Sequence, residues 1–494
     1  MPDARLDAAL TAFDHWTALE DLAADPPGGR AALAARVGER YEDAAEHERS
    51  RLDHLLGLLG QDGDSVVLGL LARGRSDELL SRTFRRRLAV PAPVLDALIE
   101  RRGYTLEVVD ALGLTGDPTR VAELGALLDD PDVCGRAASA LARLGAREWA
   151  LPIARRLPQV TGLAHGAFVV ALEQLGDTAV VPLLRDELLD GGERFTGDMH
   201  IALTRLTGHD PLIPEDGDVR RAWRELDLAT PPVPAVRFGE GGRFTVDEGR
   251  GRVRVAYDPP PPGTSWPRWN KSLHVGEHAL YRVSSDCGTC ETTMTLLGFP
   301  PAEARAGAAR FRAALADPGD AAAVVAELEP LIAELETGRY AAHLADLALE
   351  RVAEPEESWW LRRIAVRDDP ERWSVELTAW PGVEHFQVPE MIPGAVPTYG
   401  SLLPSQPLDA LDPAAVARHT SAIARGERPA ALVLAWTETR YVEAEFEERF
   451  LLGVILDGHH RLAAYAAAGV PARVLLLART DRDGAVEEVL AALR

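Results

Sequence analysis

The sequence predicts a multidomain protein with an all-α helical solenoid in its N-terminal half, an α+β middle segment and an α/β C-terminal domain. Three observations lead to this prediction. Similar helical segments recur through the first half, and the glycines that end them stand 29, 31 and 32 residues apart. From Pro231 the sequence changes to short alternations of apolar and polar residues between Gly and Pro. Near the C-terminus, an apolar strand is followed directly by an amphipathic helix and a second strand.

The repeated unit of the first half ends an apolar helix at one of four glycines, Gly116, Gly145, Gly176 and Gly208. Glycine accepts the left-handed backbone conformation, so each of them predicts a turn into a second helix. This period indicates a solenoid, and the pattern resembles short HEAT repeats. An array of unrelated helical hairpins is the alternative, because Ala, Leu and Gly are abundant in the chain. A long solenoid surface in an acidic chain favours a protein or peptide partner.

The length of 494 residues allows two to four domains, each with its own core. Alternating residues before the Pro259–Pro262 run predict a short hairpin followed by a stiff linker. In the middle segment, apolar residues recur at helical spacing and predict helices over Ala321–Val352. The predicted domains are a helical cap at 1–58, HEAT-like repeats at 59–230, a β-hairpin and Pro-rich linker at 231–265, an α+β middle domain at 266–395, and a C-terminal domain at 396–494.

Composition excludes several classes of function. The formal net charge is −24 at pH 7, and duplex DNA is bound by clustered Lys and Arg, so a DNA partner is not expected. Lys271 is the only lysine, which excludes a Walker A loop. The sequence has no apolar run of membrane-spanning length and no signal peptide at its start, so we expect no membrane partner and a cytoplasmic location. Three cysteines agree with a reducing compartment.

The strongest site signal is a polar cluster between a predicted strand and a predicted helix, made of Asp457, Gly458, His459, His460 and Arg461. The strand is the apolar run 451–456, and the helix is expected to end at Gly469. A helix N-terminus presents unpaired N–H groups and a partial positive charge, which favour phosphate. Glycine in the cluster lets backbone approach closely, and the arginine can add a charge-assisted pair of hydrogen bonds.

The sequence GHHR at 458–461 resembles the GxxR phosphate motif of the ParB/sulfiredoxin-like fold, and the resemblance extends over 396–494. The segments around it follow the same order: LLPSQPLDAL at 402–411, a helix over Pro413–Arg425, GERP at 426–429, a strand over Ala430–Trp436, the motif helix, and a strand over Ala472–Leu477. The motif is more similar to the small-molecule kinase and sulfiredoxin branches than to the DNA-partitioning branch, which has GERR. The resemblance therefore implies nucleotide phosphate contact by the four motif residues, with ATP or CTP and Mg²⁺ as cofactors.

The resemblance does not assign the catalytic base. His459 stands where sulfiredoxin has its cysteine, so reduction of cysteine sulfinic acid is not implied. Kinase-like members use a glutamate in their first segment, whereas 402–409 offers only Asp409. Glu390 and Asp457 are further candidates, and Asp457 ranks first because it adjoins the phosphate motif. Its alternative role is to cap the helix. The two histidines suit phosphate contact or acid–base catalysis better than a shared metal, because adjacent helical side chains diverge.

A second candidate site lies in the middle segment, where His274, His278, Cys287 and Cys290 follow the Pro-rich linker. Histidines four apart share one helical face and a CxxC turn can chelate one ion, so these residues can form a zinc site. Gly276 and the strand-like residues after it oppose a helix between the histidines. A redox CxxC and two chemically idle cysteines are the alternatives.

These observations lead to three hypotheses for function. In the first, the C-terminal domain is a kinase or hydrolase that transfers the phosphoryl group of a nucleotide, or hydrolyses it, while acting on a small molecule or protein. There Asp457 orients the acceptor hydroxyl or a magnesium-bound water, and His459, His460 and Arg461 neutralise developing charge. In the second, nucleotide binding gates the contact between the helical repeats and a protein partner. In the third, the chain is an interaction scaffold that binds no nucleotide.

Overall fold

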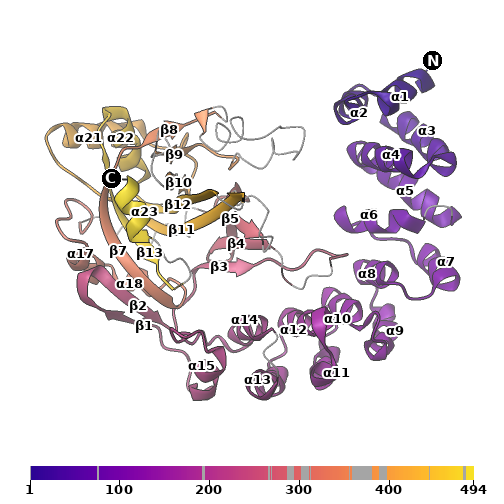
Figure 1. Cartoon of the computed structure of the whole chain (residues 1–494), viewed down its shortest axis with the longest axis horizontal. Coiled ribbons are helices and arrows are strands. Elements are labelled where there is room, and N and C mark those ends of the chain that lie inside the picture. Colours follow the sequence, from indigo (N-terminus) through magenta and orange to yellow (C-terminus); the bar gives the residue numbers. More distant parts are fainter. Residues whose placement is uncertain are drawn as a thin grey trace. The chain divides into compact units, whose positions relative to one another are not determined.

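The computed structural model describes residues 2–74, 77–191, 195–264, 268, 270–285, 294–301, 311, 313–354, 357–358, 381–388, 398–443, 446–481 and 486–493. The chain forms two compact units, drawn in Figure 1. Unit 1 comprises Met1–Thr207 together with Pro260–Pro267, and unit 2 comprises Gly208–Pro259 and Arg268–Arg494. Each unit is described by itself.

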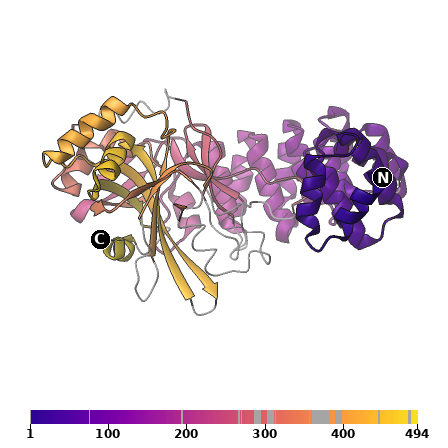
Figure 2. The same ribbon diagram turned by 90° about the horizontal axis from the view of Figure 1, so that it is seen from above.

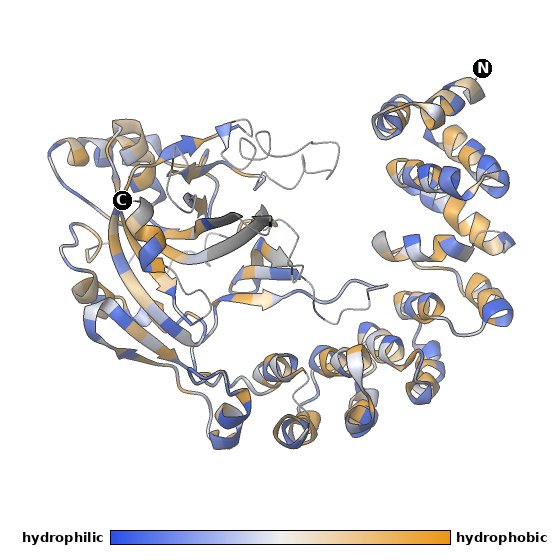
Figure 3. Cartoon of the chain, viewed as in Figure 1, coloured by the Kyte–Doolittle hydropathy of each residue, from blue (hydrophilic) through white to orange (hydrophobic). Residues whose placement is uncertain are grey.

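Unit 1 consists of α-helices joined by short 3₁₀ turns and loops, which confirms the predicted helical N-terminal half. The helices are α1 (Pro2–Thr11), α2 (His15–Ala24), α3 (Arg30–Asp43), α4 (Glu46–Leu58), α5 (Gln61–Arg73), α6 (Leu80–Arg85), α7 (Ala92–Arg102), α8 (Leu106–Leu114), α9 (Val121–Ala126), α10 (Cys134–Arg143), α11 (Ala150–Arg156), α12 (Gly162–Leu175), α13 (Val181–Asp190) and α14 (Thr196–Thr207). In Figure 3 the helices carry both orange and blue stretches, as expected of helices with one buried face.

The repeat glycines end every second helix of the array. Gly116, Gly145, Gly176 and Gly208 follow α8, α10, α12 and α14, and their φ angles lie between 65° and 77°. This confirms the predicted left-handed turns. Helix α10 packs between α8 and α12, and their facing residues, including Leu112, are fully buried. Helices α9, α11 and α13 form a second layer (Figure 1). The structure therefore has a helical array of the predicted period, and its assignment to HEAT-like repeats stays a prediction.

Unit 2 contains two β-sheets. Within the residues that the structure describes, the larger has nine strands in the order β1-β2-β7-β13-β11-β12-β10-β9-β8, and the smaller has four in the order β3-β4-β5-β6. The strands of the larger sheet are β1 (Ala235–Phe238), β2 (Arg243–Asp247), β7 (Gly338–Leu347), β8 (Glu350–Val352), β9 (His385–Gln387), β10 (Thr398–Pro404), β11 (Ala431–Glu443), β12 (Phe446–Asp457) and β13 (Ala472–Arg479). The smaller sheet is formed by β3 (Val253–Tyr257), β4 (Asn270–Val275), β5 (His278–Ser285) and β6 (Thr295–Leu296).

Both faces of the larger sheet are buried. Successive residues of its strands alternate between two cores, as a side-chain period of two requires: Leu432 lies in one core and Val433 in the other. The smaller sheet, through residues such as Leu273 and Tyr281, covers the first face. Helices α21 (Pro413–Ala424), α22 (His459–Ala468) and α23 (Val486–Leu493) cover the second. Figure 2 shows α21 and α22 on one side of the sheet and the pink strands of the smaller sheet on the other.

Two expectations about the middle of the chain differ from the structure. We expected 266–395 and 396–494 to form separate domains, but β7 from the first range pairs with β13 from the second, Leu344 opposite Leu475, so one sheet contains both. The helical prediction over 321–352 is correct only for α17 (Ala321–Glu327) and α18 (Glu329–Ile332) and is wrong for β7. Most of the Ala and Leu residues of β7 are buried, and such a run gives no helix-specific period.

The linker region also differs in part. The predicted hairpin is present as β1 and β2, in which Val236 pairs with Val246. The prolines after it were expected to form a stiff linker between domains, whereas Pro260–Pro267 belongs to unit 1. The repeats were expected to extend to residue 230, but unit 1 ends its continuous part at Thr207, and α15 (Val219–Glu225) belongs to unit 2. None of the helices in the described ranges has the length and apolar character that crossing a membrane requires.

Candidate functional site

The polar cluster lies at the junction between β12 and α22, as predicted. Strand β12 ends at Asp457, Gly458 stands between the two elements, and α22 begins at His459. Gly469, with φ of 62°, ends the helix, which confirms its predicted role. The predicted strand 451–456 is the buried end of β12. The local pattern therefore predicted the strand-to-helix junction correctly.

The sequence did not reveal that β10 contributes to this junction. Strands β10 and β12 are parallel neighbours, with Pro404 opposite Ile455, so their carboxyl ends lie side by side. Ser405 follows β10 and is buried. Its hydroxyl donates to the carbonyl oxygen of Ile455 over 2.6 Å. The only sequence signal for Ser405 was its place after the apolar residues of β10.

His459 is a structural link as well as a candidate phosphate contact. Its side chain is buried, and its Nε2 accepts a hydrogen bond from the backbone N–H of Ser405 over 3.0 Å. A ring nitrogen that accepts a hydrogen bond has no proton, so the neutral ring carries its proton on Nδ1. The hydrogen bond thus fixes the ring of His459 against the loop after β10, and its contact with phosphate stays a prediction.

His460 makes an equivalent link to a second helix. Its Nε2 accepts from the backbone N–H of Asp412 over 3.1 Å. Asp412 caps α21: its carboxylate accepts from the amides of Ala414 and Ala415 over 2.9 and 3.2 Å. The same tautomer argument leaves the proton of His460 on Nδ1. The two histidines therefore tie the first turn of α22 to the loop after β10 and to the start of α21.

Gly458 is required by the backbone of the protein itself. Its φ is 101°, a backbone conformation that residues with a side chain rarely adopt. A Cβ added to Gly458 would lie 2.7 Å from the Cα of Ala431, the first residue of β11. The sequence predicted that the backbone of Gly458 would approach a ligand closely. In the structure it approaches the neighbouring strand β11. Gly458 positions the first turn of α22 against the sheet.

Arg461 and Asp457 form an ion pair across one helical turn. Their closest side-chain atoms, Nη2 and Oδ2, are 3.4 Å apart, and both side chains are largely buried. The other terminal nitrogen of Arg461 donates to the carbonyl oxygen of Ala430. Asp457 does not cap α22, because the cap position is held by Gly458 and has no side-chain hydrogen bond, so the capping alternative is wrong. In this structure Arg461 joins α22 to Ala430, the residue before β11, and its contact with phosphate stays a prediction.

The candidate bases differ in their relation to the junction. Asp457 lies at the end of β12, directly beside the first turn of α22. Asp409 is exposed in the loop that leads from β10 to α21. Glu390 lies outside the described residues. Among the described candidates, Asp457 is the one that the structure places at the junction itself.

The second candidate site has a different geometry from the one expected. His274 and His278 lie on the two strands of the β4–β5 hairpin, where Val275 pairs with His278, so they do not share a helical face. Gly276, with φ of 62°, lies in the turn between them. Cys287 and Cys290 lie outside the described residues. Within the described ranges, no three His, Cys, Asp or Glu side chains are grouped to hold a metal ion. The zinc site stays a prediction.

The arrangement at the junction favours anions. Helix α22 begins close to the start of α21, and its first amides add partial positive charge, whereas the first amides of α21 donate to the carboxylate of Asp412. The carboxyl ends of neighbouring parallel strands in an open sheet are a common place for ligands. The turn contains Gly458, which has no side chain, and lies beside Ser405, whose side chain is small. Such a turn can orient a phosphate group and a nearby hydroxyl.

No protein-family model, curated protein or solved structure matches this chain.

Proposed function

We propose that the junction of β12 and α22 binds the phosphates of a nucleotide, ATP or CTP, and that unit 2 contains a ParB/sulfiredoxin-like domain acting as a kinase or nucleotide hydrolase. The observation that supports this most is the convergence at His459 and His460 of the carboxyl end of β10 and the first turns of α21 and α22. The entry segment at 402–411, α21, β11, α22 and β13 follow each other in the order that the resemblance implies, and β12 stands between β11 and α22.

The chain's own residues have distinct roles in this proposal. Amides in the first turn of α22 bind phosphate oxygens, and His459 and His460 hold that turn in place. The backbone amides of Ser405 and Asp412 fix the two rings. Asp457 orients the hydroxyl of the acceptor, and Arg461 keeps its carboxylate in place. The acceptor is a small molecule or a protein side chain.

Magnesium fits this site as an ion that arrives with the nucleotide. Mg²⁺ is usually held by one or two carboxylates together with substrate phosphates, and Asp457 is a carboxylate beside the proposed phosphate position. When bound, the ion would neutralise negative charge on the phosphates.

Calorimetry with ATP, ADP, CTP and GTP in the presence of Mg²⁺ tests this function. We expect heat of binding with at least one of them and a higher melting temperature in its presence. Absence of heat with all four, together with unchanged melting, would contradict the proposal. Product analysis then separates catalysis from nucleotide-gated partner binding. Release of inorganic phosphate or of a phosphorylated acceptor supports catalysis. Tight nucleotide binding without either product favours a protein in which the nucleotide gates the contact with a partner.

A protein-interaction scaffold built on the helical repeats is the second candidate function. The observation that favours it is a proline-rich turn, Pro260–Thr264, bound along the helices of unit 1. A scaffold of this kind needs no nucleotide. The two functions are located in different units of the chain and are tested separately.

A further inference from the structure

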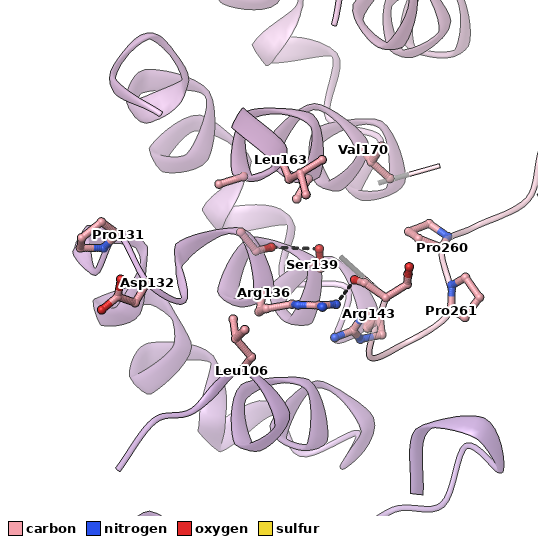
Figure 4. Close-up of a pocket in the computed structure, with 14 residues that line it drawn as sticks. Leu106, Pro131, Asp132, Arg136, Ser139, Arg143, Leu163, Val170, Pro260 and Pro261 are labelled. Atoms are coloured by element: carbon pink, nitrogen blue, oxygen red, sulfur yellow. Dashed lines mark hydrogen bonds between the residues drawn. The ribbon is translucent and has the colours of Figure 1, made fainter. Parts of the chain in front are cut away.

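Three alternate helices of unit 1, α8, α10 and α12, line a groove, which we call the inner groove. The Pro260–Thr264 segment lies along it, and Figure 4 shows Pro260 and Pro261 beside the side chains of Arg136 and Arg143. The cavity that remains between the groove and this segment has a volume of about 170 Å³. A cavity for a drug-sized ligand has roughly 300–1,000 Å³. The remaining cavity is therefore too small for a ligand of that size.

The inner groove binds the backbone of the Pro260–Thr264 segment. The guanidinium group of Arg136 donates to the carbonyl oxygen of Thr264 and, over 3.3 Å, to that of Gly263. The amide of Gly263 donates to the carboxylate of Asp110. Arg136 and Asp110 thus satisfy two backbone acceptors and one backbone donor of the segment. These contacts are made to the main chain of a tight turn, in which the amide of Thr264 donates to the carbonyl oxygen of Pro261 over 3.3 Å.

The groups that make these contacts are buried charges. The side chain of Asp110 is 1% exposed, and its oxygens lie 2.7 Å from Nη2 of Arg143 and 3.3 Å from Nη1 of Arg136. Burial raises the pKa of Asp110, and the two guanidinium groups oppose that shift. One carboxylate and two guanidinium groups leave one positive charge in excess. Carbonyl oxygens are suitable partners for that excess, because buried donors without acceptors are costly.

Two features of the segment match the groove in sequence as well as in backbone. Gly263 has φ of 82°, and a Cβ there would lie 2.5 Å from Cδ2 of Phe84, so glycine is required at this position. Proline followed by glycine favours a tight turn, because proline presets its own φ and glycine accepts positive φ. Pro260 and Pro261 line the groove together with apolar residues such as Val170. The groove and Phe84 together therefore select prolines followed closely by a glycine.

We propose that the inner groove, together with Phe84, is a binding site for proline-rich segments that turn at a glycine, and that Pro260–Thr264 occupies it as an internal ligand. A partner protein with such a segment binds when it displaces the internal one. The internal segment is tethered, so its effective concentration is high and it competes strongly with a free peptide. This inference concerns unit 1 and does not depend on nucleotide binding by unit 2.

Fluorescence anisotropy with a labelled peptide of residues 257–266 tests the proposal on the full-length chain. Gly263→Ala releases the internal segment through its contact with Phe84, and we expect it to bind the free peptide at least about tenfold more tightly than the wild type does. Gly276→Ala is the matched control, because Gly276 has φ of 62° but no atom within 4 Å of its added Cβ. It should bind the peptide as weakly as the wild type.

A second pair of variants tests the groove itself. Combined with Gly263→Ala, Arg136→Ala should weaken peptide binding at least about tenfold, because charge-assisted hydrogen bonds to two carbonyls are lost. Arg155→Ala, at an exposed position of α11, should leave the peptide affinity of the released variant unchanged.

Circular dichroism establishes that each variant is folded. If Gly263→Ala is unfolded, replacement of residues 259–262 by Gly-Ser-Gly-Ser releases the segment in its place. A folded released variant that does not bind the peptide would overturn the proposal, and so would wild type that binds it equally tightly. Retained binding by the Arg136→Ala combination would also contradict the assigned site.

Discussion

The backbone amide of Ser405 donates a hydrogen bond to Nε2 of His459 over 3.0 Å, and this contact joins the end of β10 to the first residue of α22. Both residues are buried. The hydrogen bond sets the direction of the imidazole ring and the position of its remaining proton. It therefore connects the stability of unit 2 to the donor geometry of the proposed phosphate site.

Replacing His459 by alanine should destabilise unit 2. The buried amide of Ser405 would lose its acceptor, which costs about 1–3 kcal/mol, and the lost ring leaves a cavity. Chemical denaturation measures the change in the free energy of unfolding. His47→Ala, at an exposed helical position, is the control and should stay within about 0.5 kcal/mol of the wild type. Equal stabilities of the two variants would contradict a structural role for His459.

Tyr281 supports the same loop from the smaller sheet. Its buried hydroxyl donates to the carbonyl oxygen of Pro404, the residue before Ser405, over 2.6 Å. Tyr281→Phe should lower the free energy of unfolding by about 1 kcal/mol, because a buried hydrogen bond is lost without a change in packing. Tyr104→Phe removes an exposed hydrogen bond to Glu123 and should change stability much less. The hypothesis fails if the two substitutions have equal effects in denaturant titrations.

Asp210 should make the protein less stable as the pH rises from about 4 to about 6. Burial, with a contribution from Glu336, raises the pKa of Asp210 from 3.8 to about 6. The folded chain therefore keeps this proton to higher pH than the unfolded chain does, and stability falls as pH increases through that window. Asp210→Asn removes the titration. Relative to the wild type it should gain up to about 3 kcal/mol between pH 4 and pH 7.

Urea unfolding at both pH values measures this gain for Asp210→Asn. Asparagine keeps an oxygen that can accept from the Thr337 amide, as Asp210 does over 3.2 Å. A constant difference between variant and wild type at the two pH values would contradict the shifted pKa.

His385 should have the opposite dependence on pH. Burial lowers the pKa of His385 from 6.5 to about 4, while a hydrogen bond with the carbonyl of Val383 acts in the other direction. The unfolded chain binds a proton first as the pH falls below 6.5, so stability decreases toward pH 4. This group alone should cost about 2 kcal/mol between pH 7 and pH 5. His385→Gln, which does not titrate, should lose less stability on acidification, and an equal loss would exclude His385 as a cause.

The sequence was most informative where the signal is local. Glycines at the ends of helices predicted the turns of the array, and the apolar run before Asp457 predicted the strand-to-helix junction. The partners of His459 and His460 were not predictable in this way. Ser405 reaches the junction through the parallel pairing of β10 with β12, about fifty residues away in sequence, and such pairings depend on tertiary structure.

The errors have a physical cause as well. Strand β7 was expected to be helical, because its Ala and Leu residues fit a helical stripe when the sequence is considered alone. In the structure it lies between β2 and β13 near the middle of a sheet that is covered on both faces, where the burial of its residues follows the packing. The position of Pro260–Thr264 in the inner groove was also not predictable from the sequence. Its contacts with Asp110 and Arg136 span more than one hundred residues.

Calorimetric titration of a matched pair of variants at His460 tests the central claim most directly. Both Gln and Glu can accept the hydrogen bond that the Asp412 amide donates to His460, so both should keep the junction folded. His460→Gln should retain measurable binding of the nucleotide that binds the wild type. His460→Glu should bind it at least about tenfold more weakly than His460→Gln, because a negative charge at the start of α22 repels phosphate. Equal affinity of the two variants would show that the phosphates are not held at this junction.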